Sequence, residues 1–238
     1  MWLNNCNASG RRSVPIYQTL CPLAFGRYHL KEGNAAPPHK GVSAAAYLMR
    51  LPREFYQRDG LTVARELIGK KLVTNLPEGL TSGIIVETEA YMGAIDAASH
   101  AYKGKTERTK IFYGAGGFVY VYLIYGMHIC TNVVANVEGI PEAVLIRALE
   151  PVDGVELMKR RRRQDNLRGL CSGPGKLSKA LGVTKSFYGA DLCGEEIFIE
   201  DGKALPVTAT KRINVNYAGE AAEYLWRFVA SGNAFISV

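Results

Sequence analysis

Cysteine is scarce in this 238-residue chain, and no two of its five cysteines form a Cys-x-x-Cys pair. The five, widely spaced, are Cys6, Cys21, Cys130, Cys171 and Cys193. Structural zinc sites and disulfide frameworks both depend on cysteines at short, regular spacings. The sequence therefore argues against either, and we expect no metal and a reducing, intracellular setting.

Long apolar runs and nucleotide-binding fingerprints are also missing. No run approaches the roughly 20 apolar residues that span a bilayer, so we expect no membrane partner. The chain has neither a Rossmann nor a P-loop pattern and no internal repeat, and we expect no cofactor. With 47% hydrophobic residues, it is long enough for one well-buried core.

Acidic residues are scarce in two regions. Residues 1–50 hold six Lys/Arg against Glu32 alone, and Lys159–Lys179 holds eight basic residues against Asp165 alone. The net charge of the whole chain is +7. Basic charge that is concentrated in this way favours an anionic partner.

The first part of the chain differs in composition from the rest. Residues 1–48 lack sustained periodicity and are interrupted by proline and glycine, so we expect an N-terminal extension without a fixed fold. A basic transit peptide is the alternative. The folded domain is expected to span residues 49–238.

The most informative stretch is 83–91, GIIVETEAY, which has the pattern of a buried strand. A period of two places Ile85, Glu87, Glu89 and Tyr91 on one face. Glu89 is the candidate general base, because a carboxylate held ionised by a nearby arginine can take a proton from water. An ion pair that joins two strands is the alternative. Glu87 is expected nearer the rim.

Arg147 is the expected partner of Glu89. It is the single charge within the apolar strand Ala143–Leu149, where a lone charge would be costly unless a carboxylate met it. Tyr91, Tyr122 and His100 could add flat walls suited to a planar, positively charged ligand. Ordinary packing is the alternative for each ring taken singly.

The remaining patterns predict an α+β fold: one domain with a mainly antiparallel sheet, flanking helices and a β-hairpin that turns at Gly126. Helices are expected over 61–68, from 155 into the basic run, and after Ser172, with Ser172 as N-cap and Gly182 as the stop. Strands are expected at 71–76, from the end of the turn 77–79 to Tyr91, and at 118–125, 129–135, 142–149, 197–200, 207–215 and 226–238.

Two further features suggest contact with DNA. Tyr125 and Met127 flank Gly126 at the expected hairpin tip, where large apolar side chains would be exposed and could act as a wedge between base pairs. A tip folded back on its own domain is the alternative. The basic run 159–163, with Lys159 and Arg160, and the turn containing Ser172, Gly173 and Lys176 could bind phosphates. A solvated helix face is the alternative for the basic run.

Taken together, these motifs resemble the 3-methyladenine (alkyladenine) DNA glycosylase family from about Leu51 to the C-terminus. The matching segments are LIG (67–69), IVETEAY (85–91), His100, YVYLIYGMH (120–128), Asn132, LIRALEP (145–151), LCSGPGKL (170–177), WRF (226–228) and Gly232-Asn233.

The resemblance implies a monofunctional repair enzyme without metal or cofactor that acts inside the cell on double-stranded DNA containing damaged purines. Its fold would be a single compact domain with a curved sheet and a protruding β-hairpin that enters the DNA minor groove. We expect a monomer. Glu89 would activate water and Arg147 would help to hold it. Tyr91 would stack on one side of the flipped base, with His100 and Tyr122 on the other, and Asn132 would crowd the amino group of normal guanine. Tyr125 would fill the gap left in the duplex.

Two other functions fit the same surface. One is a nucleic-acid-binding module without catalysis, and the other is a hydrolase of free nucleosides. The appearance of abasic sites in damaged DNA would exclude the first. The second would need neither the Tyr125 wedge nor the basic run.

Overall fold

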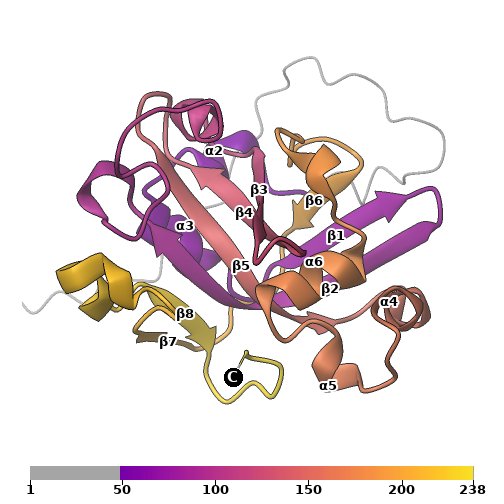
Figure 1. Cartoon of the computed structure of the whole chain (residues 1–238). Coiled ribbons are helices and arrows are strands. Elements are labelled where there is room, and N and C mark those ends of the chain that lie inside the picture. Colours follow the sequence, from indigo (N-terminus) through magenta and orange to yellow (C-terminus); the bar gives the residue numbers. More distant parts are fainter. Residues whose placement is uncertain (1–48, 238) are drawn as a thin grey trace, which may run out of the picture. The chain divides into compact units, whose positions relative to one another are not determined.

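The computed structural model describes residues 49–237 (Figure 1), and the expected N-terminal extension, residues 1–48, lies outside the described residues. The α-helices are α2 (Arg53–Tyr56), α3 (Gly60–Glu66), α4 (Val155–Arg162), α5 (Leu167–Leu170) and α6 (Pro174–Leu181). The strands are β1 (Lys71–Leu76), β2 (Gly79–Tyr91), β3 (Val119–Ile124), β4 (His128–Ala135), β5 (Glu142–Pro151), β6 (Ile197–Glu200), β7 (Val207–Thr210) and β8 (Arg227–Ala230). Short 3-10 turns occupy Gly93–Ile95, Lys110–Tyr113, Lys185–Phe187 and Asn216–Glu223.

The strands form one eight-stranded sheet, and every pairing in it is antiparallel. Its main path runs β3-β4-β5-β2-β1-β6. Strand β2 is long enough to pair with β1 over its first half and with β8 over its second half, while β5 follows its other edge. The predicted α+β fold with a mainly antiparallel sheet is therefore confirmed.

One face of the sheet carries the main core. Thr88 of β2 donates to the carbonyl oxygen of Ala64 in α3, and Thr131 of β4 shares a hydrogen bond with Ser178 of α6. Apolar side chains from both helices and from the alternate residues of β3, β4 and β5 form one buried cluster. Removal of apolar surface from water on this scale contributes more than any other interaction to the stability of a domain.

The opposite face is covered by chain segments with little regular structure. A second cluster gathers Phe112, Tyr120 and Val134, and a third gathers Ala98, Val215 and Ala218. Tyr122 packs on the edge of the second cluster and Tyr91 on the edge of the third. The candidate site residues therefore lie on the face away from α3 and α6, between two small apolar clusters.

Several details differ from the sequence-based expectations. The N-cap of α6 is Gly173, at φ 143°, and no side chain caps this helix, so Ser172 is not the cap. Gly182 does end α6, at φ 74°. Strands β7 and β8 are shorter than expected, because the chain leaves the sheet at Thr210 and at Ala230.

None of the helices in residues 49–237 is both long and apolar enough to cross a membrane.

Candidate active site

A row of facing residues crosses the sheet and brings the candidate side chains to one face. Tyr120 of β3 pairs with Asn132 of β4, Asn132 with Leu145 of β5, and Leu145 with Glu89 of β2. Residues directly opposite in an antiparallel sheet share a face. Glu89, Asn132 and Tyr120, which are far apart in sequence, thus point to the same side.

Glu89 is fully buried and each of its oxygens has a partner. Oε2 accepts a hydrogen bond from the Tyr91 hydroxyl at 2.8 Å. Oε1 accepts one from the backbone N–H of Ile213 at 2.8 Å and lies 3.4 Å from Nη1 of Arg147. A carboxylate offers about four acceptor directions, so these three contacts leave one acceptor direction of Glu89 unused.

Arg147 links the two carboxylates of β2. Its Nε donates to Oε1 of Glu87 at 3.0 Å and its Nη2 to the hydroxyl of Ser237 at 3.3 Å. The remaining nitrogen, Nη1, faces Glu89. The predicted meeting of Glu89 and Arg147 is confirmed, and the pKa of Arg147 is raised because these two carboxylates outweigh the opposing effect of burial.

Glu87 accepts more hydrogen bonds than Glu89. We expected it nearer the rim, but it lies inside the domain. Besides Arg147, it accepts from Nε of Arg227 at 2.7 Å, from the Ser237 hydroxyl at 2.9 Å and from the Ser237 N–H at 2.6 Å. Its side chain is fully buried. A buried carboxylate is tolerated only when it is paired and hydrogen-bonded in this way.

The alternation of β2 is irregular where Glu87 enters the site. The pairing with β5 shifts between Ile85 and Glu87 and shifts back at Thr88, which leaves Arg147 without a facing partner. Ile85 lies in the main core together with Val86. The predicted two-residue period thus holds from Glu87 to Tyr91 but does not extend back to Ile85.

A buried ion pair between Arg212 and Asp96 packs against the ring of Tyr91. The Arg212 guanidinium lies 4.9 Å from the centre of the Tyr91 ring and 5.1 Å from that of Trp226. Asp96 accepts two hydrogen bonds from Arg212, at 2.5 and 2.8 Å. Burial and the neighbouring Glu89 raise the pKa of Tyr91 well above its ordinary value, so its hydroxyl stays protonated and donates to Glu89.

His100 and Tyr122 form the second aromatic wall. Their ring centres are 4.6 Å apart in an edge-to-face arrangement, and Tyr122 stacks on Tyr120 at 5.6 Å. Nδ1 of His100 lies 3.0 Å from the Tyr120 hydroxyl. Desolvation of the imidazole, with the nearby Arg108 as the second cause, lowers the pKa of His100 to about 4. His100 is therefore neutral at pH 7.

Asn132 lies in the same row, where its amide donates to the backbone carbonyl of Tyr120 at 3.1 Å. It is buried, and it faces Leu145. This bond fixes the orientation of the amide, so the side chain is a rigid part of the site wall.

The hairpin of β3 and β4 ends in an exposed apolar tip. Tyr125 is 76% exposed and Met127 is 73% exposed, so the tip does not fold back on the domain. A hydrogen bond from the Met127 N–H to the Ile124 carbonyl closes the turn, and both Tyr125 and Gly126 have positive φ, 52° and 70°. A tyrosine is locally unfavourable at such a position, where asparagine or glycine is preferred.

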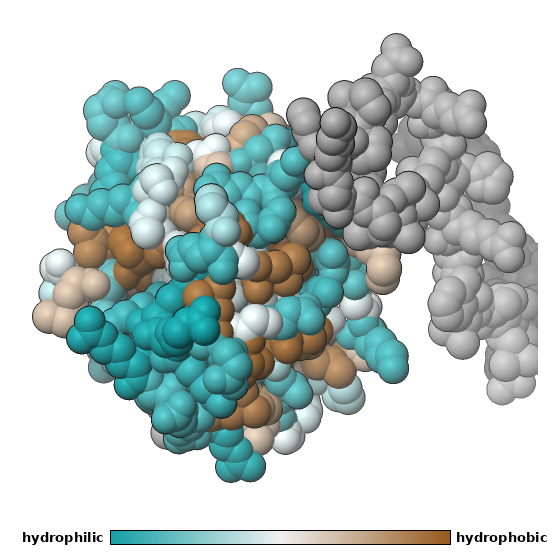
Figure 2. Space-filling model, turned by 90° about the vertical axis from the view of Figure 1, so that its right-hand side faces the viewer, coloured by the Kyte–Doolittle hydropathy of each residue, from teal (hydrophilic) through white to brown (hydrophobic). Residues whose placement is uncertain are grey.

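The candidate phosphate-binding residues lie in and near α4 and α6, but not all of them are on the surface: Gly173 is buried and Ser172 is half-buried. Lys159 is paired with Glu156, whereas Arg160 and Lys176 are exposed. Gly175 approaches the His128 side chain so closely that a Cβ would lie 2.9 Å from it, which brings the start of α6 to the base of the hairpin. The side of the molecule that carries α4 in Figure 1 faces the viewer in Figure 2, where a broad hydrophilic area is visible.

Sequence reasoning missed several residues that build the site. They are Asp96, Arg108, Arg212, the Ile213 N–H, Arg227 and Ser237. The one available signal was the need of Glu87, a second carboxylate in a buried strand, for cations of its own. Arg161, within the basic run, instead bonds the Ala180 carbonyl and Thr81, so it holds α4 to the domain.

Comparison with known proteins matches the sequence of this chain to a family. The family described as methylpurine-DNA glycosylase matches residues 54–234. Proteins from Alkaliphilus oremlandii and Desulfitobacterium hafniense are 50% and 47% identical to this chain, over 79% and 80% of it and 99% and 100% of their own lengths. A protein from Methanocella arvoryzae is 48% identical over 79% of this chain and 95% of its own length. All three are named "Putative 3-methyladenine DNA glycosylase". The chain therefore belongs to the methylpurine-DNA glycosylase family.

Proposed function

We propose that this protein removes damaged purines from duplex DNA by flipping the damaged nucleotide out of the helix and hydrolysing its N-glycosidic bond with a water activated by Glu89. Family membership supplies the activity class, a DNA glycosylase for alkylated bases in repair. The observation that carries the proposal is the Glu89–Arg147 pair beside Tyr91, on the sheet face that also holds Asn132.

The aromatic side chains suit a flipped purine. Tyr91 offers one ring face and His100 with Tyr122 offers others, and stacking of this kind favours a planar ligand. N3- and N7-alkylated purines carry a positive charge, which adds an attraction to the tyrosine faces. Because His100 is neutral, it does not repel such a base. Asn132, fixed by its bond to Tyr120, is suited to crowd the amino group of an undamaged guanine.

Arg147 would orient the attacking water, and Glu89 would accept its proton. Arg147 is anchored through Nε and Nη2, so Nη1 is the nitrogen that can orient a water against Glu89. The water oxygen attacks C1′ of the deoxyribose and its proton passes to Glu89. The electrons of the broken bond leave with the purine, and an abasic site remains. Glu89 also stabilises the oxocarbenium character of C1′, as carboxylates do in glycoside hydrolysis.

The exposed tip and the basic surface would hold the DNA. Tyr125, with Met127 beside it, would occupy the gap that the flipped nucleotide leaves, a role that apolar wedges play in other minor-groove proteins. Lys159, Arg160, Ser172, Gly173 and Lys176 would contact phosphates around it. Extrusion of a nucleotide from the duplex costs a few kcal/mol, and less for a poorly stacked lesion. Damaged nucleotides would therefore enter the site more readily than undamaged ones.

The test is an excision panel. Duplexes that contain 7-methylguanine, hypoxanthine or ethenoadenine are incubated with the protein, and free base and abasic sites are measured. We expect release of at least one damaged purine and none of normal guanine. A protein that only binds DNA would form no abasic sites, and a nucleoside hydrolase would cleave free nucleosides and ignore the duplex.

A further inference from the structure

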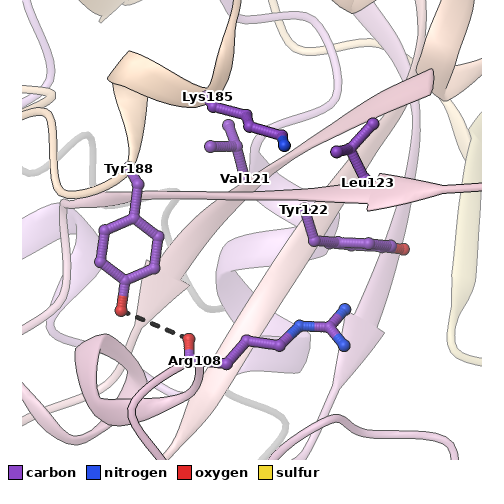
Figure 3. A pocket seen from close by; sticks show the side chains of 6 residues that line it. All are labelled: Arg108, Val121, Tyr122, Leu123, Lys185 and Tyr188. Atoms are coloured by element: carbon purple, nitrogen blue, oxygen red, sulfur yellow. Dashed lines mark hydrogen bonds between the residues drawn. The ribbon is translucent and has the colours of Figure 1, made fainter. Parts of the chain in front are cut away.

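A cavity of about 460 Å³ lies on the outer side of β3, next to the aromatic wall (Figure 3). Its lining residues are Arg108, Val121, Tyr122, Leu123, Lys185 and Tyr188. Strand β3 begins the path of the sheet, so its outer edge is free of any further strand. Tyr122 belongs both to this cavity and to the wall beside His100.

The free edge of β3 supplies backbone donors to this cavity. The Val119 N–H donates outward to the Ala190 carbonyl, and the Val119 carbonyl accepts from Gly189, so the groups of Val119 point away from β4. Alternate residues of an antiparallel strand point their backbone groups to the same edge. The N–H groups of Val121 and Leu123 therefore also point outward, toward the cavity.

Two cationic side chains flank this edge without a carboxylate to neutralise them. Within residues 49–237, Arg108 and Lys185 form no ion pair; Arg108 donates to the Tyr120 hydroxyl at 3.0 Å and lies over the Tyr122 ring at 5.5 Å. In Figure 3 the two side chains extend on opposite sides of the β3 ribbon. Two unpaired positive charges next to outward-facing N–H groups fit an anion.

We propose that this cavity binds one backbone phosphate of the DNA strand that carries the damaged nucleotide. The inference rests on the proposed function, since a flipped nucleotide against Tyr122 would bring its own strand along the edge of β3. Arginine, lysine and backbone N–H groups are the usual donors to DNA phosphates, and such contacts fix the register of a protein on the duplex. A bound phosphate would also hold Arg108 in place against the Tyr122 ring.

The variant that tests this is Lys185→Ala, because among residues 49–237 Lys185, unlike Arg108, forms no hydrogen bond or cation–π contact with the aromatic wall. Its matched control is Lys203→Ala, an exposed lysine whose backbone lies beside Gly69, at the far end of the sheet path. We expect Lys185→Ala to lower the log–log salt dependence of duplex binding by about 0.9, the value for one phosphate contact. Lys203→Ala should leave that slope unchanged.

A second measurement locates the phosphate. Single phosphates of the damaged strand are replaced in turn by uncharged methylphosphonate, and duplex affinity is measured for the wild type and both variants. At one position near the lesion, we expect the replacement to weaken binding by Lys185→Ala less than it weakens binding by the wild type and Lys203→Ala, since two changes to one contact are not additive.

The inference is overturned if the fold-losses are additive at every position, or if the salt slope of Lys185→Ala equals that of the control. Failure of the proposed function has a different signature. In that case no damaged base is released by the wild-type protein, whatever the coupling between Lys185 and a phosphate.

Discussion

Glu87 sets the position of Arg147, and through it the geometry around Glu89. Its two oxygens accept from Arg147, Arg227 and Ser237, so a single buried charge balances two arginines. These contacts leave only Nη1 of Arg147 directed at Glu89. Glu87 is thus a positioning residue, and the stability of the domain depends on it.

Replacement of Glu87 by glutamine should lower the free energy of unfolding by roughly 3–5 kcal/mol, because it leaves the buried Arg147 and the half-buried Arg227 without their shared counter-charge. Urea unfolding measures the loss. The matched control is Glu66→Gln, which removes an exposed pair with Arg58 and should cost less than about 1 kcal/mol. Equal, small losses in both variants would refute this role of Glu87.

The low pKa of His100 can be measured by NMR. An NMR titration of its ring should show a midpoint near the value of about 4, with His100→Asn used to assign the signal. The folded pKa lies below the unfolded value of about 6.5, so the unfolded chain binds the proton more readily between these values. The contribution of His100 to stability is therefore present above pH 6.5 and lost as the pH falls toward 4. A midpoint at or above 6.5 would contradict this environment.

For single residues, the sequence predicts an ion pair between two side chains better than a hydrogen-bond network of several residues. Glu89 and Arg147 could be matched in advance, because each is a charge within an apolar strand and neither can be buried alone. The depth of Glu87 could not, because its partners Arg227 and Ser237 come from the far end of the chain. The Ile213 N–H carries no side-chain signal at all.

The hairpin of β3 and β4 combines an exposed tip with a locally unfavourable residue. Tyr125 sits at φ 52°, a conformation that costs a non-glycine residue about 1–2 kcal/mol, and its side chain makes no buried contact in return. A local cost without local gain points to a function outside the domain.

The variant Tyr125→Ala should therefore be as stable as the wild type but bind a lesion duplex more weakly. We expect the free energy of unfolding to change by no more than about 0.5 kcal/mol, as for other surface sites. Affinity for a lesion duplex should fall, while excision from a damaged single strand, which has no gap to fill, should change little. The control is Val137→Ala, another exposed apolar residue, located after β4 at the opposite end of that strand. Equal losses on single and double strands would argue against the wedge.

Among the elements, locally encoded ones were predicted best. The bounds of β1 and β6 agree with the expected ranges, since turn residues and alternation mark both strands. The cap of α6 was predicted wrongly, because the helix starts one residue later than expected, after Gly173, whose φ of 143° favours glycine. The division of β2 between β1 and β8 depends on long-range pairing, which no local pattern contains.

On the scale of the whole molecule, residues 49–237 contain every group assigned to the site, and the family match covers 54–234. Deletion of residues 1–48 should therefore leave the rate of base release unchanged. The comparison is a single-turnover assay of the full and shortened chains on the same lesion duplex. A large loss of rate would mean that the first 48 residues contribute to the site.

The central claim is that Glu89 activates the attacking water, and Glu89→Gln tests it most directly. Glutamine keeps the shape of the side chain but cannot take the proton, and loss of a general base costs about 10²–10⁴-fold in rate. Base release from an ethenoadenine or hypoxanthine duplex, whichever the wild type excises, is measured under single-turnover conditions, with duplex affinity as the control for folding. The account predicts a loss of that size at unchanged affinity. Release by the variant at a rate near that of the wild type would contradict it.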